Sequence, residues 1–248
     1  MITMKKIDIF NIKIHPLSKK DFLDIIEFRI KEGKQTVQNG VNAASLNALI
    51  YNKELLQAYN NSDLINIDGM SMVWALRFLG YPVPERVACP DLASDILALA
   101  EKENYSVFLF GAKETSLSQS VKNLITDFPK LNIVGHRNGY YQIEDEYSIV
   151  KMINDSMPDI LLLGMPSPRK ELFVEKYKDK LQVKYFFGVG GFFDIISGKT
   201  KRAPLWMQKK GLEWVYRFMQ EPKRMWYRYM VGNIKFIGLV IKEKCKRK

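Results

Sequence analysis

Short apolar runs recur along the middle of the chain, and each of them is closed by a glycine. These runs occupy residues 106–111, 131–135, 159–164 and 183–188. Apolar runs of this length between turn residues are typical of strands buried on both faces. The intervening segments have the spacing of amphipathic helices, at 91–103, 117–128, 146–157 and 171–181. This alternation predicts an α/β fold with a Rossmann-like, doubly wound and mostly parallel sheet.

The first third of the chain extends the same pattern. One helix is expected over residues 46–60, and a short strand over 64–68 leads into a second helix that ends near residue 79. Asp68 therefore stands at the carboxyl end of a strand. In open parallel sheets this edge binds ligands, because the loops there vary and the helix N-termini present free amide donors.

The C-terminal segment differs from the rest, and we expect a boundary between a core, residues 1–197, and a helical basic appendage, residues 198–248. The last 50 residues carry 15 Lys and Arg but only 3 Asp and Glu, whereas residues 1–198 carry 23 and 24. Three of the four tryptophans and several apolar residues at helical spacing lie there too. Such a surface suits nucleic-acid phosphates, anionic lipid headgroups or a phosphorylated substrate.

The composition indicates a folded protein and bears on its cellular location and its need for a cofactor. With 47% hydrophobic residues the chain can bury a large core. Cys89 and Cys245 are far apart and form no disulfide framework, which favours a cytoplasmic location. The N-terminus lacks signal-peptide features, and no apolar run reaches the ~18 residues of a membrane span. His, Cys, Asp and Glu do not cluster at ligand spacing, so neither a metal nor a cofactor is predicted.

Asp68 is the best candidate for a catalytic base, since a carboxylate at the end of a strand could take the proton of an attacking hydroxyl. A turn-forming or helix-capping aspartate is the structural alternative. The glycines at 188, 190 and 191 would let the backbone approach a nucleotide, and Asp194 could accept hydrogen bonds from it. A plain strand-to-helix turn explains these glycines equally well.

Three further groups of polar residues stand out. The loop from Gly164 to Glu171 brings two prolines, two cations and a carboxylate to the start of a helix, where pyrophosphate could bind. Arg86 and Asp91 are either a loop-shaping ion pair or part of a site. In the appendage, arginines alternate with aromatic residues, a combination that suits phosphate at a membrane surface or the solvated face of a helical hairpin.

Taken in order, these motifs resemble the WecG/TagA/CpsF family of bacterial glycosyltransferases, which includes N-acetylmannosaminyltransferases of wall teichoic acid and enterobacterial common antigen assembly. The resemblance runs from about residue 42 to residue 229. Its marks are Asn42-Ala43, Asp68-Gly69, Arg86 with Asp91, Gly139-Tyr140-Tyr141, the 164–171 loop, the 188–194 segment, Arg202-Ala-Pro204, Gly211-Leu-Glu-Trp-Val-Tyr-Arg217 and Glu221-Pro-Lys-Arg224.

The resemblance implies an inverting, metal-independent transfer from a UDP-sugar to a sugar on undecaprenyl diphosphate, by an enzyme peripheral on the inner face of the cell membrane. It implies that Asp68 is the base. We assign the nucleotide-sugar side to Asn42, Arg86, Tyr140, Gly164, Lys170, Glu171, Gly188, Gly190, Gly191 and Asp194. We assign the acceptor diphosphate or an anionic membrane surface to Arg202, Arg217, Arg224 and Arg228. A homo-oligomer is left open.

The chain also departs from the family pattern. Gly40 stands where the family usually has Thr, Cys89-Pro90 replaces Gly-Ser, and the motif at 168–171 reads Pro-Arg-Lys-Glu instead of Pro-Lys-Gln-Glu. Lost polar groups in a sugar-facing shell change which sugar is read, so UDP-N-acetylmannosamine, UDP-glucose and similar donors stay open. Capsule or exopolysaccharide assembly is favoured over teichoic acid.

Two other functions compete with transfer of a sugar. A non-catalytic nucleic-acid-binding protein would use the basic aromatic tail, but it leaves the loop motifs upstream unexplained, so we expect no nucleic-acid partner. An NAD-dependent oxidoreductase is disfavoured, since the glycines lack the dinucleotide fingerprint.

Overall fold

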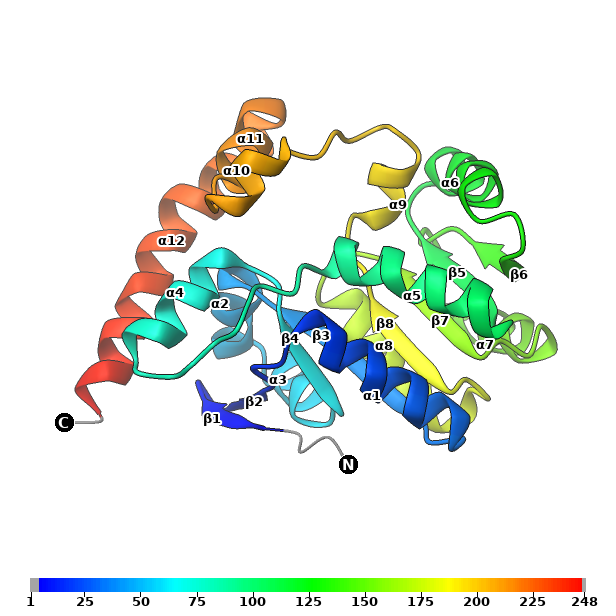
Figure 1. The fold of residues 1–248 in the computed structure, drawn as a ribbon, viewed down its shortest axis with the longest axis horizontal. Helices are drawn as coiled ribbons and strands as arrows, with labels where there is room; N and C mark the ends of the chain where they lie inside the picture. The colour runs from blue at the N-terminus through cyan, green and yellow to red at the C-terminus, as the bar shows by residue number, and fades with distance from the viewer. Residues whose placement is uncertain (1–4, 247–248) are drawn as a thin grey trace.

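A six-stranded parallel sheet forms the centre of the protein (Figure 1). The computed structural model describes residues 5–246, apart from the side chain of Arg224. The strand order is β4-β3-β8-β7-β5-β6. The strands are β3 (Thr36–Val41), β4 (Leu64–Ile67), β5 (Ser106–Gly111), β6 (Asn132–Arg137), β7 (Ile160–Gly164) and β8 (Tyr185–Gly188). Since all six run in the same direction, the loops that follow them meet at one edge.

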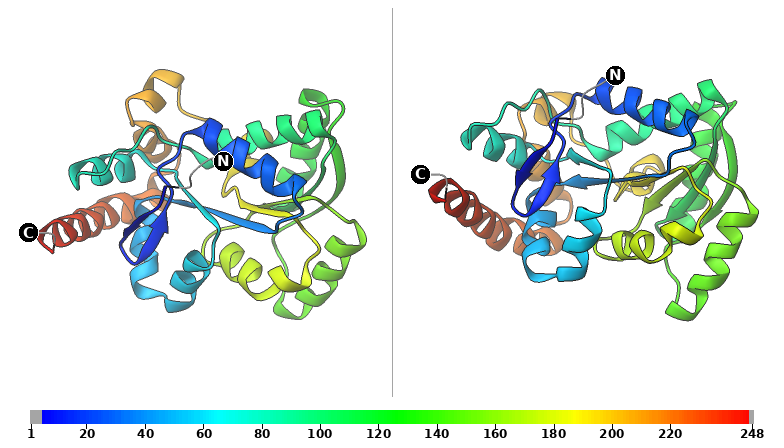
Figure 2. Two further views of the ribbon diagram at one scale, coloured as in Figure 1. Left: turned by 60° about the horizontal axis from the view of Figure 1, so that its bottom comes forward. Right: turned by 90° about the horizontal axis from the view of Figure 1, so that it is seen from below.

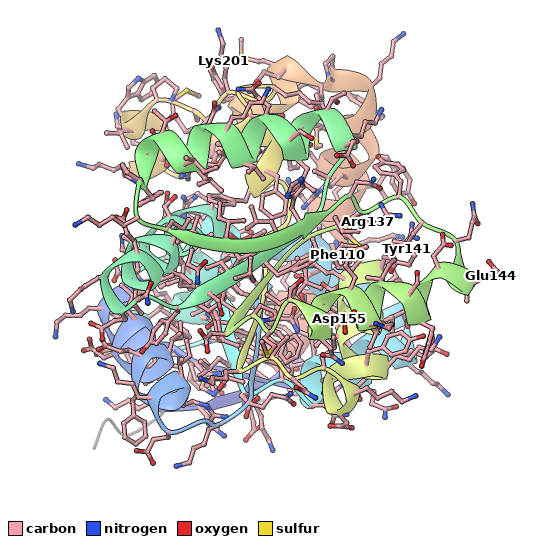
Figure 3. All side chains as sticks on the ribbon, turned by 90° about the vertical axis from the view of Figure 1, so that its right-hand side faces the viewer. Phe110, Arg137, Tyr141, Glu144, Asp155 and Lys201 are labelled. Atoms are coloured by element: carbon pink, nitrogen blue, oxygen red, sulfur yellow. The ribbon has the colours of Figure 1, made fainter. Side chains whose placement is uncertain are left out.

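Helices cover both faces of the sheet, as the doubly wound prediction requires. One face carries α1 (Lys19–Lys31), α5 (Cys89–Glu103) and α6 (Glu114–Asp127). The other carries α7 (Glu146–Asp155) and α8 (Arg169–Tyr177), and next to them lie α2 (Ala43–Tyr51), α3 (Lys53–Asn60) and α4 (Met70–Phe78). Figure 3, seen from the β6 edge, shows α6 and α7 on opposite sides of the sheet. The Rossmann-like fold class is confirmed.

Strand β5 illustrates why such a strand must be apolar throughout. Val107 and Leu109 pack toward α5 and α6, whereas Phe108 and Phe110 pack toward α7 and α8. All four side chains are buried because successive residues point to opposite faces and both faces are covered.

The N-terminal part adds a small antiparallel hairpin, β1 (Ile7–Ile9) and β2 (Ile12–Ile14). Phe10 and Asn11 form its turn with φ of 55° and 62°, the backbone that matches the twist of a hairpin. His15 then fixes the hairpin to the sheet: its N–H donates to the Ile65 carbonyl, and its Nδ1 accepts from the Ile65 N–H at 2.9 Å. Burial lowers the pKa of His15 to about 4.

Most of the elements expected from the sequence are present, with two corrections. The single helix predicted over 46–60 is wrong, because Asn52 has an extended backbone there and its side chain caps α3 by accepting from Leu55 N–H at 2.9 Å. The strand predicted at 131–135 continues to Arg137, so Gly135 lies inside it. Three elements were missed: the hairpin, α1 and β3.

After α9 (Phe192–Ile196), the C-terminal segment contributes α10 (Leu205–Lys209), α11 (Glu213–Gln220) and the long α12 (Pro222–Cys245). Both views in Figure 2 show α12 along the side of the molecule that carries α2 and α4. Asn47 of α2 donates to the Gly232 carbonyl at 2.7 Å, and Phe236 and Val240 are buried in the same apolar cluster as α2, α4 and the hairpin. The boundary at residue 197 stays a prediction.

No helix within residues 5–246 combines the length and the apolar character that a bilayer crossing requires.

Phe236→Ala should lower the free energy of unfolding by about 3 kcal/mol, since it leaves a cavity where α12 meets the core. The ring is 5% exposed. Urea titration followed by circular dichroism measures the change. Phe28 is the matched control, because its ring is 56% exposed and its removal should cost less than about 0.5 kcal/mol. Equal losses in the two variants would contradict the observed packing of α12.

Candidate active site

A cleft of about 1490 Å³ opens at the carboxyl ends of the strands, between the sheet and the C-terminal helices. It lies where open parallel sheets bind ligands. Of the candidate residues whose side chains are described, all but Arg202 line it: Asn42, Asp68, Arg86, Tyr140, Gly164, Lys170, Glu171, Gly188, Gly190, Gly191, Asp194, Arg217 and Arg228. Residues from distant parts of the sequence therefore meet in one place.

The carboxylate of Asp68 is held in a fixed orientation. Asp68 follows β4 directly, and its Oδ1 accepts a hydrogen bond from the Cys89 N–H at 2.8 Å. Its Oδ2 accepts from Asn42 Nδ2 at 3.0 Å. Each carboxylate oxygen has a second lone pair, so both can still accept from a substrate hydroxyl.

Asn42 has two tasks at the start of α2. Its Oδ1 caps the helix by accepting from the N–H groups of Ala44 and Ser45, at 3.0 and 3.1 Å. Its Nδ2 donates to Asp68. The cap thus fixes the amide that orients the carboxylate, which links local helix formation to the site.

The glycine segment after β8 lines the same cleft as Asp68, and only β3 separates β8 from the strand that precedes Asp68. Gly190 has a φ of +58°, a conformation that favours glycine. A Cβ added at Gly191 would lie 3.6 Å from Nη2 of Arg217, so an arginine of α11 reaches this loop. Asp194 of α9 lines the cleft and pairs with Lys199 Nζ at 2.9 Å. In a nucleoside diphosphate, the phosphates could contact the backbone of this loop and the Arg217 guanidinium, and the nucleoside could contact the Asp194 carboxylate.

The 164–171 loop brings a buried ion pair to the floor of the cleft. Lys170 Nζ contacts Glu171 Oε1, and the Glu171 side chain is fully buried. Its Oε2 has no hydrogen-bond partner among the described residues. Gly188 makes room for Lys170, because an added Cβ would lie 2.7 Å from Lys170 Cε. An unsatisfied buried carboxylate oxygen is costly and is suited to accept from a ligand hydroxyl or amide.

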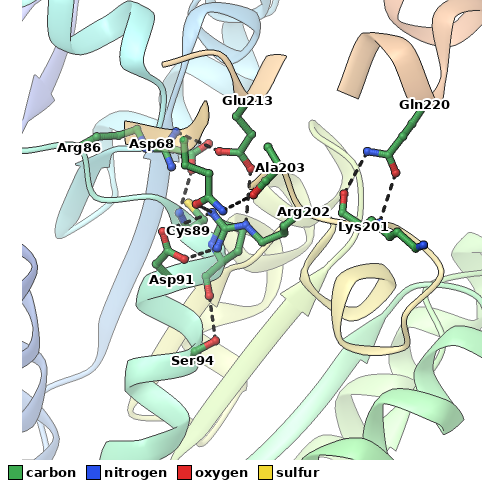
Figure 4. A network of polar contacts seen from close by, with 12 residues as sticks. Asp68, Arg86, Cys89, Asp91, Ser94, Lys201, Arg202, Ala203, Glu213 and Gln220 are labelled. Carbon is green, nitrogen blue, oxygen red and sulfur yellow. Dashed lines mark hydrogen bonds and ion pairs between the residues drawn. The ribbon is translucent and has the colours of Figure 1, made fainter. Parts of the chain in front are cut away.

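The suggested ion pair between Arg86 and Asp91 is wrong, because each residue pairs with the C-terminal segment instead (Figure 4). Arg86 Nη1 donates to Glu213 Oε2 at 3.0 Å. Asp91 binds the guanidinium of Arg202, whose Nε lies 3.6 Å from Glu213 Oε1. The chain Arg86–Glu213–Arg202–Asp91 therefore ties α11 to the loop before α5. Arg202 serves in this clamp, outside the residues that line the cleft.

The remaining candidates lie at the rim. Tyr140 is exposed beside the cleft, whereas the neighbouring Tyr141 packs in the core against Phe110 and Phe173. Arg228 lines the cleft from α12. The side chain of Arg224 lies outside the described part of the structure.

The sequence model of the glycosyl transferase WecG/TagA/CpsF family matches residues 7–248. The chain belongs to this family. The protein is thus a glycosyltransferase.

Two relatives make the comparison more specific. Over 228 residues the glycosyltransferase is 30% identical to the N-acetylglucosaminyldiphosphoundecaprenol N-acetyl-beta-D-mannosaminyltransferase of Bacillus subtilis (strain 168), covering 92% of this chain and 88% of that protein. It is 31% identical over 183 residues to the enzyme of the same name from Bacillus spizizenii, covering 74% of this chain and 70% of that one.

Two of the departures from the family pattern contact each other beneath Asp68. A Cβ added at Gly40 would overlap Sγ of Cys89 and lie 3.2 Å from Cβ of Asp68. The Cys89 thiol is buried and within 3.5 Å of Asn66 Nδ2. Burial raises the pKa of this thiol well above its ordinary value, and the charge of Asp68 acts in the same direction. The absence of a side chain at Gly40 therefore makes room for the Cys89 thiol.

Several cleft residues escaped the sequence interpretation. Trp74 lies on the first turns of α4, and Glu213 opens α11. Glu213 belongs to the Gly-Leu-Glu-Trp motif at 211–214, so the sequence already pointed to this residue. Its ion pairs with Arg86 and Arg202 could not be read from the sequence. Within residues 5–246, no group of three or more His, Cys, Asp or Glu could hold a metal ion.

Gly40→Ala should lower the free energy of unfolding by about 2 kcal/mol, because the new methyl group overlaps the Cys89 thiol. In Gly40→Ala/Cys89→Ala the sulfur is gone, and most of that loss should return. Urea titration of the two single variants and the double variant gives the coupling between the sites. Strictly additive effects would mean that the two residues do not compete for the same space.

Proposed function

We propose that the protein is an inverting glycosyltransferase that moves a sugar from a UDP-sugar onto a sugar carried by undecaprenyl diphosphate. The donor would be UDP-N-acetylmannosamine, UDP-glucose or a similar sugar nucleotide, and the product would enter a capsule, exopolysaccharide or teichoic acid. The names of both relatives support this class of acceptor. Membership of the family favours it over a nucleic-acid-binding protein. Association of several copies stays a prediction.

The oriented carboxylate of Asp68 carries the proposal. Asn42 and the Cys89 N–H use one lone pair on each oxygen, and the cleft lies in front of both. The acceptor hydroxyl gives its proton to Asp68 while its oxygen forms the bond to the anomeric carbon. The bond from that carbon to the UDP oxygen breaks at the same time. Attack opposite to the leaving group inverts the anomeric configuration.

The departing UDP needs positive charge and hydrogen-bond donors. We assign these to the backbone of the glycine segment and to Arg217, which lies beside Gly191 and which we therefore place with the donor instead of the acceptor. Guanidinium groups bind phosphate oxygens with two parallel hydrogen bonds. This arrangement supports transfer without a divalent cation, and transfer that persists in excess EDTA would agree with it.

The C-terminal helices support a location at the inner face of the cell membrane. On α12 an exposed apolar stripe runs at helical spacing through Trp226, Met230 and Ile234. Lysines and arginines flank it, as in helices that lie in the plane of an anionic membrane. An acceptor anchored in the bilayer would meet the cleft there.

Asp68→Asn should reduce transfer by about 10²–10⁴-fold, because the amide cannot take the proton. UDP binding and the thermal midpoint should change little, since Asn can still accept from Cys89 N–H. Release of UDP, measured with a panel of UDP-sugars and N-acetylglucosaminyl-diphosphoundecaprenol, reports the reaction. Asp127→Asn, an exposed carboxylate on α6, is the control and should be unaffected. Full activity in Asp68→Asn would reject the assigned base.

Trp226→Ser/Ile234→Ser should weaken binding to anionic phospholipid vesicles by about tenfold or more, since two exposed apolar side chains are lost from the membrane-facing stripe. Vesicle sedimentation measures the binding. Tyr147→Ser/Ile125→Ser removes a comparable exposed pair from α7 and α6 and should bind like the unmodified protein. If both pairs behave alike, α12 is not the membrane contact.

A further inference from the structure

The cleft changes in character along its length. Its charged lining residues, among them Asp68, Glu171, Asp194, Arg217 and Arg228, lie near the ends of the strands and on α11 and the first turns of α12. Beyond Arg228, no described residue of α12 that lines the cleft is charged. The same holds for α4, throughout its length. One continuous cavity thus has a polar end and an apolar end.

The apolar end is a groove between α4 and α12. We call it the α4–α12 groove and define it by Trp74, Phe78, Phe236, Ile237, Val240 and Ile241. Phe236 and Val240 form its buried floor, whereas Trp74, Phe78, Ile237 and Ile241 are each about half exposed. Several large apolar side chains that stay exposed along one groove are a sign of a binding site.

Contacts at both ends of the groove fix the position of α4. At the near end, the turn at Gly211 packs on Trp74, whose ring atom Cζ2 would lie 2.8 Å from an added Cβ. At the far end, Lys244 Nζ donates to the Phe78 carbonyl at 3.1 Å and lies 5.3 Å from the centre of its ring. From Tyr229 to Ile241 the lining of α12 extends over about 18 Å at the rise of an α-helix. The groove is therefore elongated.

We propose that the α4–α12 groove binds the first isoprene units of the lipid-linked acceptor. This inference rests on the proposed function, and continuity with the active-site cleft identifies the occupant. An acceptor whose sugar lies at Asp68 and whose diphosphate lies near Arg228 continues into the apolar lining that α4 and α12 form. The groove thereby binds the isoprene chain of the acceptor. This fixes the diphosphate, which in turn places the sugar hydroxyl next to Asp68.

Two water-soluble ligands test the groove without a membrane and without catalysis. Farnesyl diphosphate and dimethylallyl diphosphate share the same headgroup but differ in tail length. The unmodified protein should bind the farnesyl compound about tenfold or more tightly, since a longer tail buries more apolar surface. Calorimetric titration gives both Kd values. Equal Kd values for the two ligands would overturn the proposal, even if transfer to lipid-linked sugars is observed.

Ile237→Ser/Ile241→Ser should remove most of the preference for the longer tail and leave the Kd of dimethylallyl diphosphate unchanged. Both side chains are half exposed, so the variant should keep its thermal midpoint. The matched control is Ile234→Ser/Ile125→Ser, which removes two exposed isoleucines that do not line the cleft. The control should keep the preference. A preference that survives in the groove variant, or disappears in the control, would overturn the assignment.

Two other occupants would give different results, and each would refute the proposal. If bilayer acyl chains fill the groove, the tail-length preference is absent and Ile237→Ser/Ile241→Ser weakens vesicle binding as much as Trp226→Ser/Ile234→Ser. If a second copy of the chain covers it, light scattering shows an oligomer that dissociates only in Ile237→Ser/Ile241→Ser. A failure of the proposed transfer itself is separate, because it would appear as no UDP release while the tail-length preference remains.

Discussion

Glu213 is shared by two arginines, and the completeness of the site depends on this arrangement. Arg86 approaches it from the loop before α5, and Arg202 approaches it while also binding Asp91. These side chains are largely withdrawn from solvent, where losing one partner leaves an uncompensated charge. The clamp fixes α11 over the sheet edge and thereby places Arg217 beside the glycine segment. Without these ion pairs, α11 would not be held against the sheet edge, and the cleft would lack the side that this helix forms.

Because these ion pairs fix it to the core, the basic C-terminal segment is an integral part of the structure. Its helices contribute Arg217 and Arg228 to the cleft, bury Phe236 and Val240 against the core, and present a second apolar stripe to the outside. A helix with two apolar faces can connect a protein core with a lipid surface. The polar-to-apolar order of the cleft follows from where α12 crosses α4.

Much of the fold could be predicted from the sequence, because strands buried on both faces and amphipathic helices leave a clear period. Strand β3 could not, since its residues Thr36, Gln38 and Asn39 are polar. They are buried nonetheless: Gln38 donates to Asn66 Oδ1 at 3.0 Å and accepts from the Tyr185 hydroxyl at 2.8 Å. Such a network satisfies polar groups inside a sheet, but its members come from three strands and carry no local signal.

For the site, ordered motifs identified the residues that line the cleft, but not their partners. In the sequence, Gly40 and Cys89 look like two separate losses of a polar group. In the structure they are coupled, because the Cys89 thiol fills the space beneath Asp68 that a side chain at position 40 would need. The carboxylate keeps both of its donors, because one is a backbone N–H and the other is Asn42. The departures therefore leave the orientation of the Asp68 carboxylate intact and alter the lining of the cleft beside it.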